Sequence, residues 1–77
     1  MTEQELRTEF SRRLLRLAYQ KGKYDQKELA EISGISETTI SYYMNGMCLP
    51  KMGNIVKLAQ ALNCSTDELI MVDEPIE

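Results

Sequence analysis

Apolar residues recur at intervals of three or four along most of this chain, which is the spacing of one face of an α-helix. The first such stripe consists of Leu6, Phe10, Leu14, Leu17 and Ala18. The strict alternation of apolar and polar residues that is typical of a half-buried β-strand does not occur in the sequence. The pattern therefore predicts an all-α protein.

Helix starts are marked by capping boxes, in which a residue with a side-chain oxygen is followed by glutamate three positions later. The side-chain oxygen and the glutamate each accept a hydrogen bond from the other residue's backbone amide, and the first turn of the helix is thereby closed. The sequence contains this pattern at three places, namely Thr2 with Glu5, Asp25 with Glu28, and Ser65 with Glu68.

Helix ends are marked by residues that favour a left-handed backbone or a turn. Gly22 is expected to end the first helix and Gly34 the second. Ser36 is expected to cap a third helix that Asn45-Gly46 closes, and Asn63 to end a fourth. Together these signals predict five helices with short connections, arranged as an all-α orthogonal bundle.

The length of 77 residues is enough for one domain with a small core. The chain contains no histidine, and its two cysteines, Cys48 and Cys64, lack the spacing of a metal site or a disulfide framework. No apolar run approaches the roughly 20 residues needed to cross a bilayer, and the residues after Met1 do not resemble a signal peptide. We therefore expect a cytoplasmic protein that is not an enzyme and uses no cofactor, metal or membrane.

The formal net charge of −3 is unevenly distributed along the chain. Residues 1–24 and 47–66 are basic, whereas residues 67–77 carry five acidic residues and no basic one. Because the acidic excess lies at the carboxyl end, the whole-chain charge does not exclude a nucleic-acid partner. We expect one domain over residues 1–72, followed by an acidic, frayed tail at 73–77.

Residues 26–46 have the arrangement of a helix-turn-helix, namely a short helix, a turn centred on Gly34 and a second helix. Leu29, Ala30 and Ile32 are expected to face inward from the first helix. Ala30 allows the two helices to cross closely, and Ile40 fills the angle between them. A generic pair of packed helices can use the same residues, so this spacing alone leaves DNA binding and a purely structural corner equally open.

Beyond this spacing, the chain matches a known pattern without a gap from Gln26 to Leu69. The matching residues are Gln26, Leu29-Ala30, Ser33-Gly34-Ile35-Ser36, Thr39-Ile40-Ser41, Asn45-Gly46, Pro50, Ile55, Leu58-Ala59, Ala61-Leu62 and Asp67-Glu68-Leu69. In these residues the sequence resembles the lambda-repressor/Cro-like helix-turn-helix (XRE) family. The resemblance implies a lambda-repressor-like bundle. It also implies a sequence-specific DNA-binding transcriptional regulator of bacterial or phage type, which binds a double-stranded operator as a homodimer.

The resemblance also implies which residues contact DNA. Residues 36–45 correspond to the recognition helix, whose first turns enter the major groove. Gln26 and Asn45 correspond to positions that contact the DNA backbone, and Lys27 and Lys51 are the basic residues best placed to add phosphate contacts. The expected DNA-binding residues are Gln26, Lys27, Ser36, Glu37, Thr38, Thr39, Ser41, Tyr42, Asn45 and Lys51. The expected dimer interface is Leu69, Ile70, Met71 and Val72.

Two departures from the family pattern favour an alternative. The recognition helix contains no lysine or arginine, so the common bidentate contact of arginine with guanine is impossible there. The segment after Asn45-Gly46 is the apolar Met47-Cys48-Leu49, where many relatives carry basic residues. The alternative function is therefore a protein-interaction module, such as an antitoxin or a protein that binds another regulator, with weak or no DNA binding.

Overall fold

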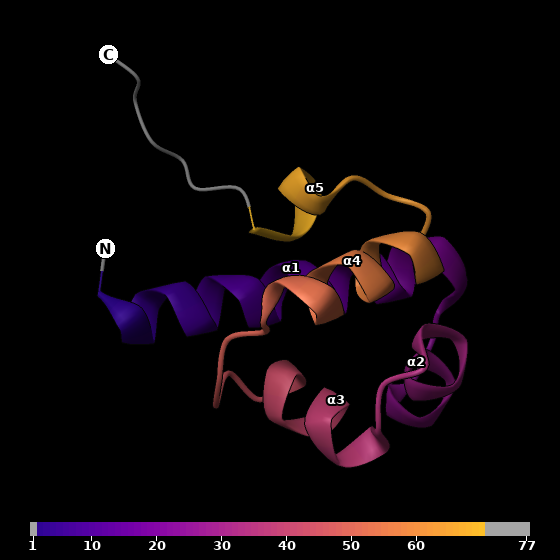
Figure 1. Ribbon diagram of the computed structural model, residues 1–77, viewed down its shortest axis with the longest axis horizontal. Coiled ribbons are helices and arrows are strands. Elements are labelled where there is room, and N and C mark those ends of the chain that lie inside the picture. Colours follow the sequence, from indigo (N-terminus) through magenta and orange to yellow (C-terminus); the bar gives the residue numbers. More distant parts are fainter. Residues whose placement is uncertain (1, 71–77) are drawn as a thin grey trace.

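The computed structural model describes residues 2–70, and this part of the chain contains helices, turns and loops but no strand (Figure 1). The helices are α1 (Glu3–Gly22), α2 (Gln26–Ser33), α3 (Glu37–Met44), α4 (Met52–Ala61) and α5 (Thr66–Ile70). The all-α five-helix prediction is thus confirmed. The tail predicted at 73–77 lies outside the described residues.

The helix starts have the local bonds that the sequence predicts. At each capping box the capping side chain accepts a bond from the glutamate amide, and the glutamate side chain accepts one from the capping residue's amide. These bonds join Thr2 with Glu5, Asp25 with Glu28, and Ser65 with Glu68. Ser36 caps α3 by accepting a bond from the amide of Thr39 at 3.2 Å.

The helix α1 ends at Gly22, as predicted, but the glycine does not itself take the left-handed backbone. Gly22 is the last helical residue, and the left-handed residue is Lys23, with φ of 53°. A Cβ atom at Gly22 would lie 2.5 Å from the Cζ atom of Tyr24. The glycine is therefore explained by the close approach of the Tyr24 ring, which packs against the core.

One hydrophobic core joins all five helices. Each helix contributes a side chain that is fully buried, and these are Leu14, Leu29, Ile40, Leu58 and Leu69. Ile32 is exposed, which corrects the expectation that it faces inward. The buried residues of α2 are Leu29 and Ser33, one helical turn apart, so Ile32 lies at the edge of the buried face.

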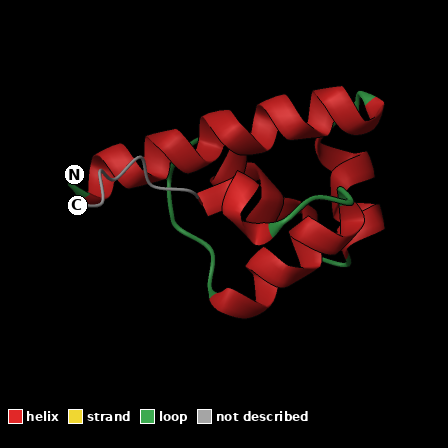
Figure 2. Ribbon diagram, turned by 90° about the horizontal axis from the view of Figure 1, so that it is seen from above, coloured by secondary structure: helices red, strands yellow, loops and turns green. Residues whose placement is uncertain are grey.

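The packing places α3 and α5 on opposite sides of α1 and α4 (Figure 1). The helix α1 runs along one edge of the bundle, and the other helices lie to one side of it (Figure 2). The helix α2 packs against α3 and α4, while α1 packs against α3 and α5. The short α3 is thereby supported by two neighbours and has an outer side that no other described helix covers.

The turn between α2 and α3 depends on Gly34, whose φ is 76° and whose amide donates to the carbonyl of Ala30 at 3.0 Å. We expect Gly34→Ala to lower the free energy of unfolding by about 1 kcal/mol, because a side chain disfavours the left-handed backbone. No atom lies within 4 Å of the added Cβ, so the change in the free energy of unfolding reflects backbone strain and not a steric clash. Urea denaturation followed by circular dichroism measures this change.

Gly53 provides the matched control for this substitution. It lies in the first turn of α4 with no positive φ, and its added Cβ also meets no atom within 4 Å. Gly53→Ala should therefore raise the free energy of unfolding, by about 0.5–1 kcal/mol. Equal effects of the two substitutions would contradict the role given to Gly34.

Candidate nucleic-acid interface

The helix α3 is held against the bundle at its middle and at its carboxyl end. Ile40 is fully buried in the core shared with α2. Farther along α3, the ring of Tyr43 packs edge-on against that of Phe10 in α1, with centroids 5.6 Å apart. The hydroxyl of Ser11 donates a hydrogen bond to the carbonyl of Met44. These contacts fix the orientation of α3 and therefore determine which of its side chains face solvent.

The residues on the outer side of α3 are polar or aromatic. Glu37 and Thr38 in the first turn are exposed, and Tyr42, one turn farther along, is 47% exposed. The helix α3 itself lies on the opposite side of α1 and α4 from α5 (Figure 1). Three of the residues expected to bind DNA therefore share one accessible surface, which we call the α3 face.

Other predicted site residues are engaged in bonds within the protein. The hydroxyl of Ser36 accepts from the amide of Thr39 and donates to the Thr39 hydroxyl at 2.8 Å. Thr39 is half-buried, and so is Ser41. The amide group of Asn45 donates to the carbonyl of Ser41 at 2.8 Å. These bonds shape the first and last turns of α3 in the unbound protein.

One side-chain hydrogen bond connects the starts of α2 and α3. The half-buried Gln26 donates from its Nε2 atom to the Oε2 atom of Glu37 at 3.4 Å. Because each residue is the first of its helix, the bond links the two helices at the edge of the α3 face. It leaves the other carboxylate oxygen of Glu37 able to accept from another donor.

Two of the predicted site residues are exposed lysines at helix starts. Lys27 is exposed in the first turn of α2, and Lys51 is exposed at the start of α4. Lys51 is the N-cap residue of α4, and this helix start has no side-chain cap. Asn54, in the first turn of α4, donates to the hydroxyl of Tyr43 at 2.8 Å, which holds this helix start beside α3.

The amino end of α4 is a candidate binding element that the sequence analysis did not name. Its first backbone amides have no side-chain acceptor, and the helix dipole makes this end partially positive. Such an end suits a phosphate group. The signal was present in the sequence, because Lys51 cannot cap a helix and Gly53 lies in the first turn.

The four residues expected at a dimer interface occupy different environments. Leu69 is fully buried in the protein's own core, so it offers no surface to a second protomer. This corrects its place in the predicted interface. The neighbouring Ile70 is 38% exposed, while Met71 and Val72 lie outside the described residues.

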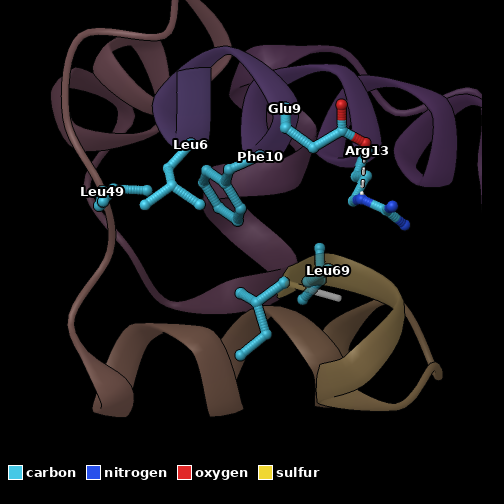
Figure 3. Close-up of a pocket in the computed structure, with 7 residues that line it drawn as sticks. Leu6, Glu9, Phe10, Arg13, Leu49 and Leu69 are labelled. Carbon is cyan, nitrogen blue, oxygen red and sulfur yellow. Dashed lines mark ion pairs between the residues drawn. The ribbon is translucent and has the colours of Figure 1, made fainter. Parts of the chain in front are cut away.

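A small apolar cavity of about 50 Å³ lies between α1, α5 and the loop before α4 (Figure 3). Leu6 and Phe10 of α1 face Leu69 across it, and Leu49 lies at its side. Ile70 also lines this cavity, so the exposed apolar surface of α5 continues onto α1 and the loop. At the rim, Glu9 forms an ion pair of 2.9 Å with Arg13.

The described residues contain no cluster of three or more side chains of the types that could hold a metal ion. Within the same part of the chain, no helix is both long enough and apolar enough to cross a membrane. Burial raises the pKa of the Cys64 thiol above its ordinary value, and the nearby Glu68 carboxylate raises it further. The Cys64 thiol is therefore protonated at neutral pH, which is the opposite of an activated nucleophile.

A family model described as helix-turn-helix matches residues 15–69, which is most of the chain. The chain therefore belongs to the helix-turn-helix family, and the resemblance to its lambda-repressor/Cro-like branch is confirmed.

Among curated proteins, the chain is similar to a transcriptional repressor of the cryptic phage CTXphi, RstR, from Vibrio cholerae. The two are 48% identical over 44 residues, which cover 57% of this chain and 39% of the repressor. It is also 40% identical over 52 residues to an uncharacterized helix-turn-helix-type transcriptional regulator, RC1195, from Rickettsia conorii, covering 62% of this chain and 48% of that protein. The matches thus span less than half the length of these relatives.

Two solved structures share the fold. A hypothetical transcription factor from Neisseria, NHTF, superposes with a TM-score of 0.80 at 27% identity, covering 95% of this chain and 83% of that one. The solution structure of an SOS-response transcriptional repressor, LexA, from Eubacterium rectale has a TM-score of 0.78 at 28% identity. The superposition covers all of this chain and 87% of the LexA chain.

Proposed function

We propose that this chain is a sequence-specific DNA-binding transcriptional regulator that places α3 in the major groove of a duplex operator and performs no catalysis. One observation carries the proposal. The α3 face presents Glu37, Thr38 and Tyr42 to solvent from a helix that buried residues hold on the other side. The transcriptional roles of the two curated relatives support the proposal, as does family membership. We place this activity in the cytoplasm of a bacterium or in a phage-infected cell.

The chemistry of the α3 face suits particular bases. Glu37 can accept a hydrogen bond from the exocyclic amine of cytosine, and the methyl group of Thr38 can contact the methyl group of thymine. Tyr42 reaches far enough to contact a phosphate or the face of a thymine. Because α3 contains no arginine or lysine, guanine is not read from this helix by a bidentate cation.

Contacts with the phosphate backbone would come from residues outside the α3 face. We assign them to Gln26, Lys27, Asn45 and Lys51, together with the uncapped amino end of α4. Ser36, Thr39 and Ser41 support the geometry of α3, and their hydroxyls can accept or donate to DNA after exchanging their internal bonds. The number of cations is small, which predicts weak binding to unrelated DNA.

Selection of bound duplexes from a random pool, followed by affinity measurement at several salt concentrations, tests the function. We expect one enriched sequence pattern and a log–log salt slope of magnitude about 2–4 per protomer, since each neutralised phosphate contributes about 0.9. A protein that shows no preference among duplexes at low salt is not a sequence-specific regulator.

We further propose that one domain over residues 1–72 binds DNA as a homodimer, with Ile70 at the centre of the contact. The apolar surface around Ile70 continues over Leu49 and Leu6, and burying it would add to the small core of a chain this size. A two-fold pair would read two half-sites separated by about one helical turn of DNA. Met71 and Val72 extend the proposed interface along the sequence.

Ile70→Glu is expected to convert the dimer into a monomer, because dimer formation would bury the glutamate charge against apolar side chains. Light scattering coupled to size-exclusion chromatography measures the mass, and we expect the apparent dimer dissociation constant to rise by about a hundredfold. Val56→Glu is the control, since Val56 is equally exposed but lies on α4 away from this cavity. A wild-type monomer, or a dimer unaffected by Ile70→Glu, would contradict the proposal.

A second candidate function is supported by the apolar loop after α3. Met47 is 63% exposed and Met52 is 69% exposed, with the exposed Leu49 between them. Exposed apolar groups this close together are common at protein interfaces. In this alternative the same scaffold binds another protein, as an antitoxin or a protein that binds another regulator would.

Met47→Asp separates the two functions. If the loop is a protein-binding surface, a partner that copurifies with the wild-type chain should lose about tenfold or more in affinity. If the chain acts mainly through the α3 face, Met47→Asp should leave the preferred duplex sequence unchanged and weaken binding only through added negative charge. Competition with a selected duplex in fluorescence anisotropy distinguishes these results.

A further inference from the structure

The outer side of α1 carries a continuous exposed stripe that the proposed function does not use. It consists of Arg12, Leu15, Arg16 and Tyr19, whose spacing places them on one side of the helix, and of Lys23, which follows the helix and lies over the ring of Tyr19. We call this surface the α1 stripe. Tyr19 follows Phe10 by nine residues, or about two and a half turns, so it points away from the core that Phe10 enters. No described helix covers this side of α1 (Figure 2).

The α1 stripe is basic within an acidic chain. Residues 8–24 contain five basic residues and one acidic residue, Glu9, whereas the whole chain has a net charge of −3. Glu9 pairs with Arg12 at 2.7 Å and with Arg13 at 2.9 Å. Arg16 and Lys23 form no ion pair with any residue between 2 and 70. Their charges are therefore available to an external acidic group.

The same surface exposes two large apolar side chains between its cations. Leu15 is 46% exposed and Tyr19 is 63% exposed. Lys23 lies over the ring of Tyr19, with its Nζ atom 5.8 Å from the ring centroid. Arginine and tyrosine flanked by an aliphatic residue have the composition of the central part of a protein–protein interface.

We infer that the α1 stripe is a docking surface for an acidic amphipathic segment of a partner protein. Charge complementarity requires acidic groups opposite Arg12, Arg16 and Lys23, and the exposed Leu15 and Tyr19 require an apolar strip between those groups. A helix with leucine-like residues on one side and glutamates along its edges meets both requirements. This inference does not depend on DNA binding by α3.

Two other polyanions fit the surface less well. A nucleic acid would neutralise the cations but would leave Leu15 without an apolar partner. An anionic membrane surface binds helices with a wide apolar side, and the α1 stripe has only two apolar residues. A second copy in a symmetric contact would bring the same cations together, which disfavours self-association through this surface.

Panning a phage-displayed library of random peptides against the immobilised full chain tests the inference. We expect the enriched peptides to carry glutamate or aspartate together with apolar residues at helical spacing. Anisotropy with a selected peptide should show that R16E/K23E weakens binding by about a hundredfold and that Tyr19→Ala weakens it by about tenfold. A peptide in which the acidic residues are replaced by lysine should regain affinity for R16E/K23E.

Lys57→Glu is the matched control, because Lys57 is an exposed cation on α4 outside the α1 stripe. It should change the affinity of the selected peptide by less than about twofold. Circular dichroism should show the wild-type helix content in every variant. Enrichment of peptides without acidic residues, or equal losses in Lys57→Glu and R16E/K23E, overturns the inference.

Parallel titrations with a mixed-sequence duplex and with phosphatidylserine vesicles identify the other outcomes. R16E/K23E could weaken binding to the duplex or to the vesicles as much as it weakens binding to the peptide, with Tyr19→Ala having no effect on peptide binding. In that case the surface is a general polyanion site and the inference fails. Unchanged binding to duplex and vesicles, with loss of the peptide alone, supports it.

Discussion

The double substitution T38A/Y42A is expected to reduce affinity for a selected operator by about a hundredfold or more while leaving the helix content unchanged. Both side chains are exposed on the α3 face and make no hydrogen bond with another side chain within residues 2–70. Each contact with a base or a nearby phosphate contributes about 1–3 kcal/mol, and both would be removed. Anisotropy with the operator and with a mixed-sequence duplex measures the loss and its specificity.

T8A/Y19A is the matched control for this experiment. It removes the same groups from exposed positions of α1, a helix that carries none of the residues of the α3 face. Its operator affinity should equal that of the wild type. If T38A/Y42A binds the operator as tightly as T8A/Y19A does, α3 does not read the DNA. The exposure of the α3 face would then no longer support the proposed function.

The largest loss of stability is expected from Ile40→Ala. Ile40 is fully buried in the core shared by α2 and α3, so its truncation removes apolar contacts and leaves a cavity between the two helices. Substitutions of this kind cost about 2–5 kcal/mol, and we expect about 3 kcal/mol here. In a chain of this size that is a large part of the total free energy of unfolding. Urea denaturation measures it.

Ile32→Ala provides the control for Ile40→Ala. It deletes the same atoms from an exposed position on the neighbouring helix α2. We expect a change within about 0.5 kcal/mol, as for surface substitutions in general. A loss comparable to that of Ile40→Ala would mean that the α2–α3 packing extends to the outer side of α2.

The parts of the fold that local chemistry determines could be predicted from the sequence. The capping boxes at Thr2, Asp25 and Ser65 form because their partners lie within the same helical turn. Gly34 takes a positive φ because the connection between α2 and α3 requires it. These features depend on residues separated by a few positions, so the sequence contains the necessary information.

The features that could not be predicted depend on residues that are distant in sequence or on the edges of a buried face. A short amphipathic helix does not show where its buried face ends, and Ile32 accordingly lies outside it. Leu69 belongs to the core rather than to an interface because α5 packs against α1, which is far away in the sequence. The bond between Gln26 and Glu37 likewise appears only when two helix starts meet.

The α3 face rests on a helix of eight residues, Glu37–Met44. Isolated helices shorter than about 12–15 residues are barely populated in water, so this surface exists only while the whole domain is folded. An operator would therefore bind the folded state alone and raise the melting temperature in proportion to the logarithm of its free concentration at saturation. Gene control by such a protein would weaken with rising temperature as the folded fraction falls, which makes the domain's thermal stability part of its regulatory range.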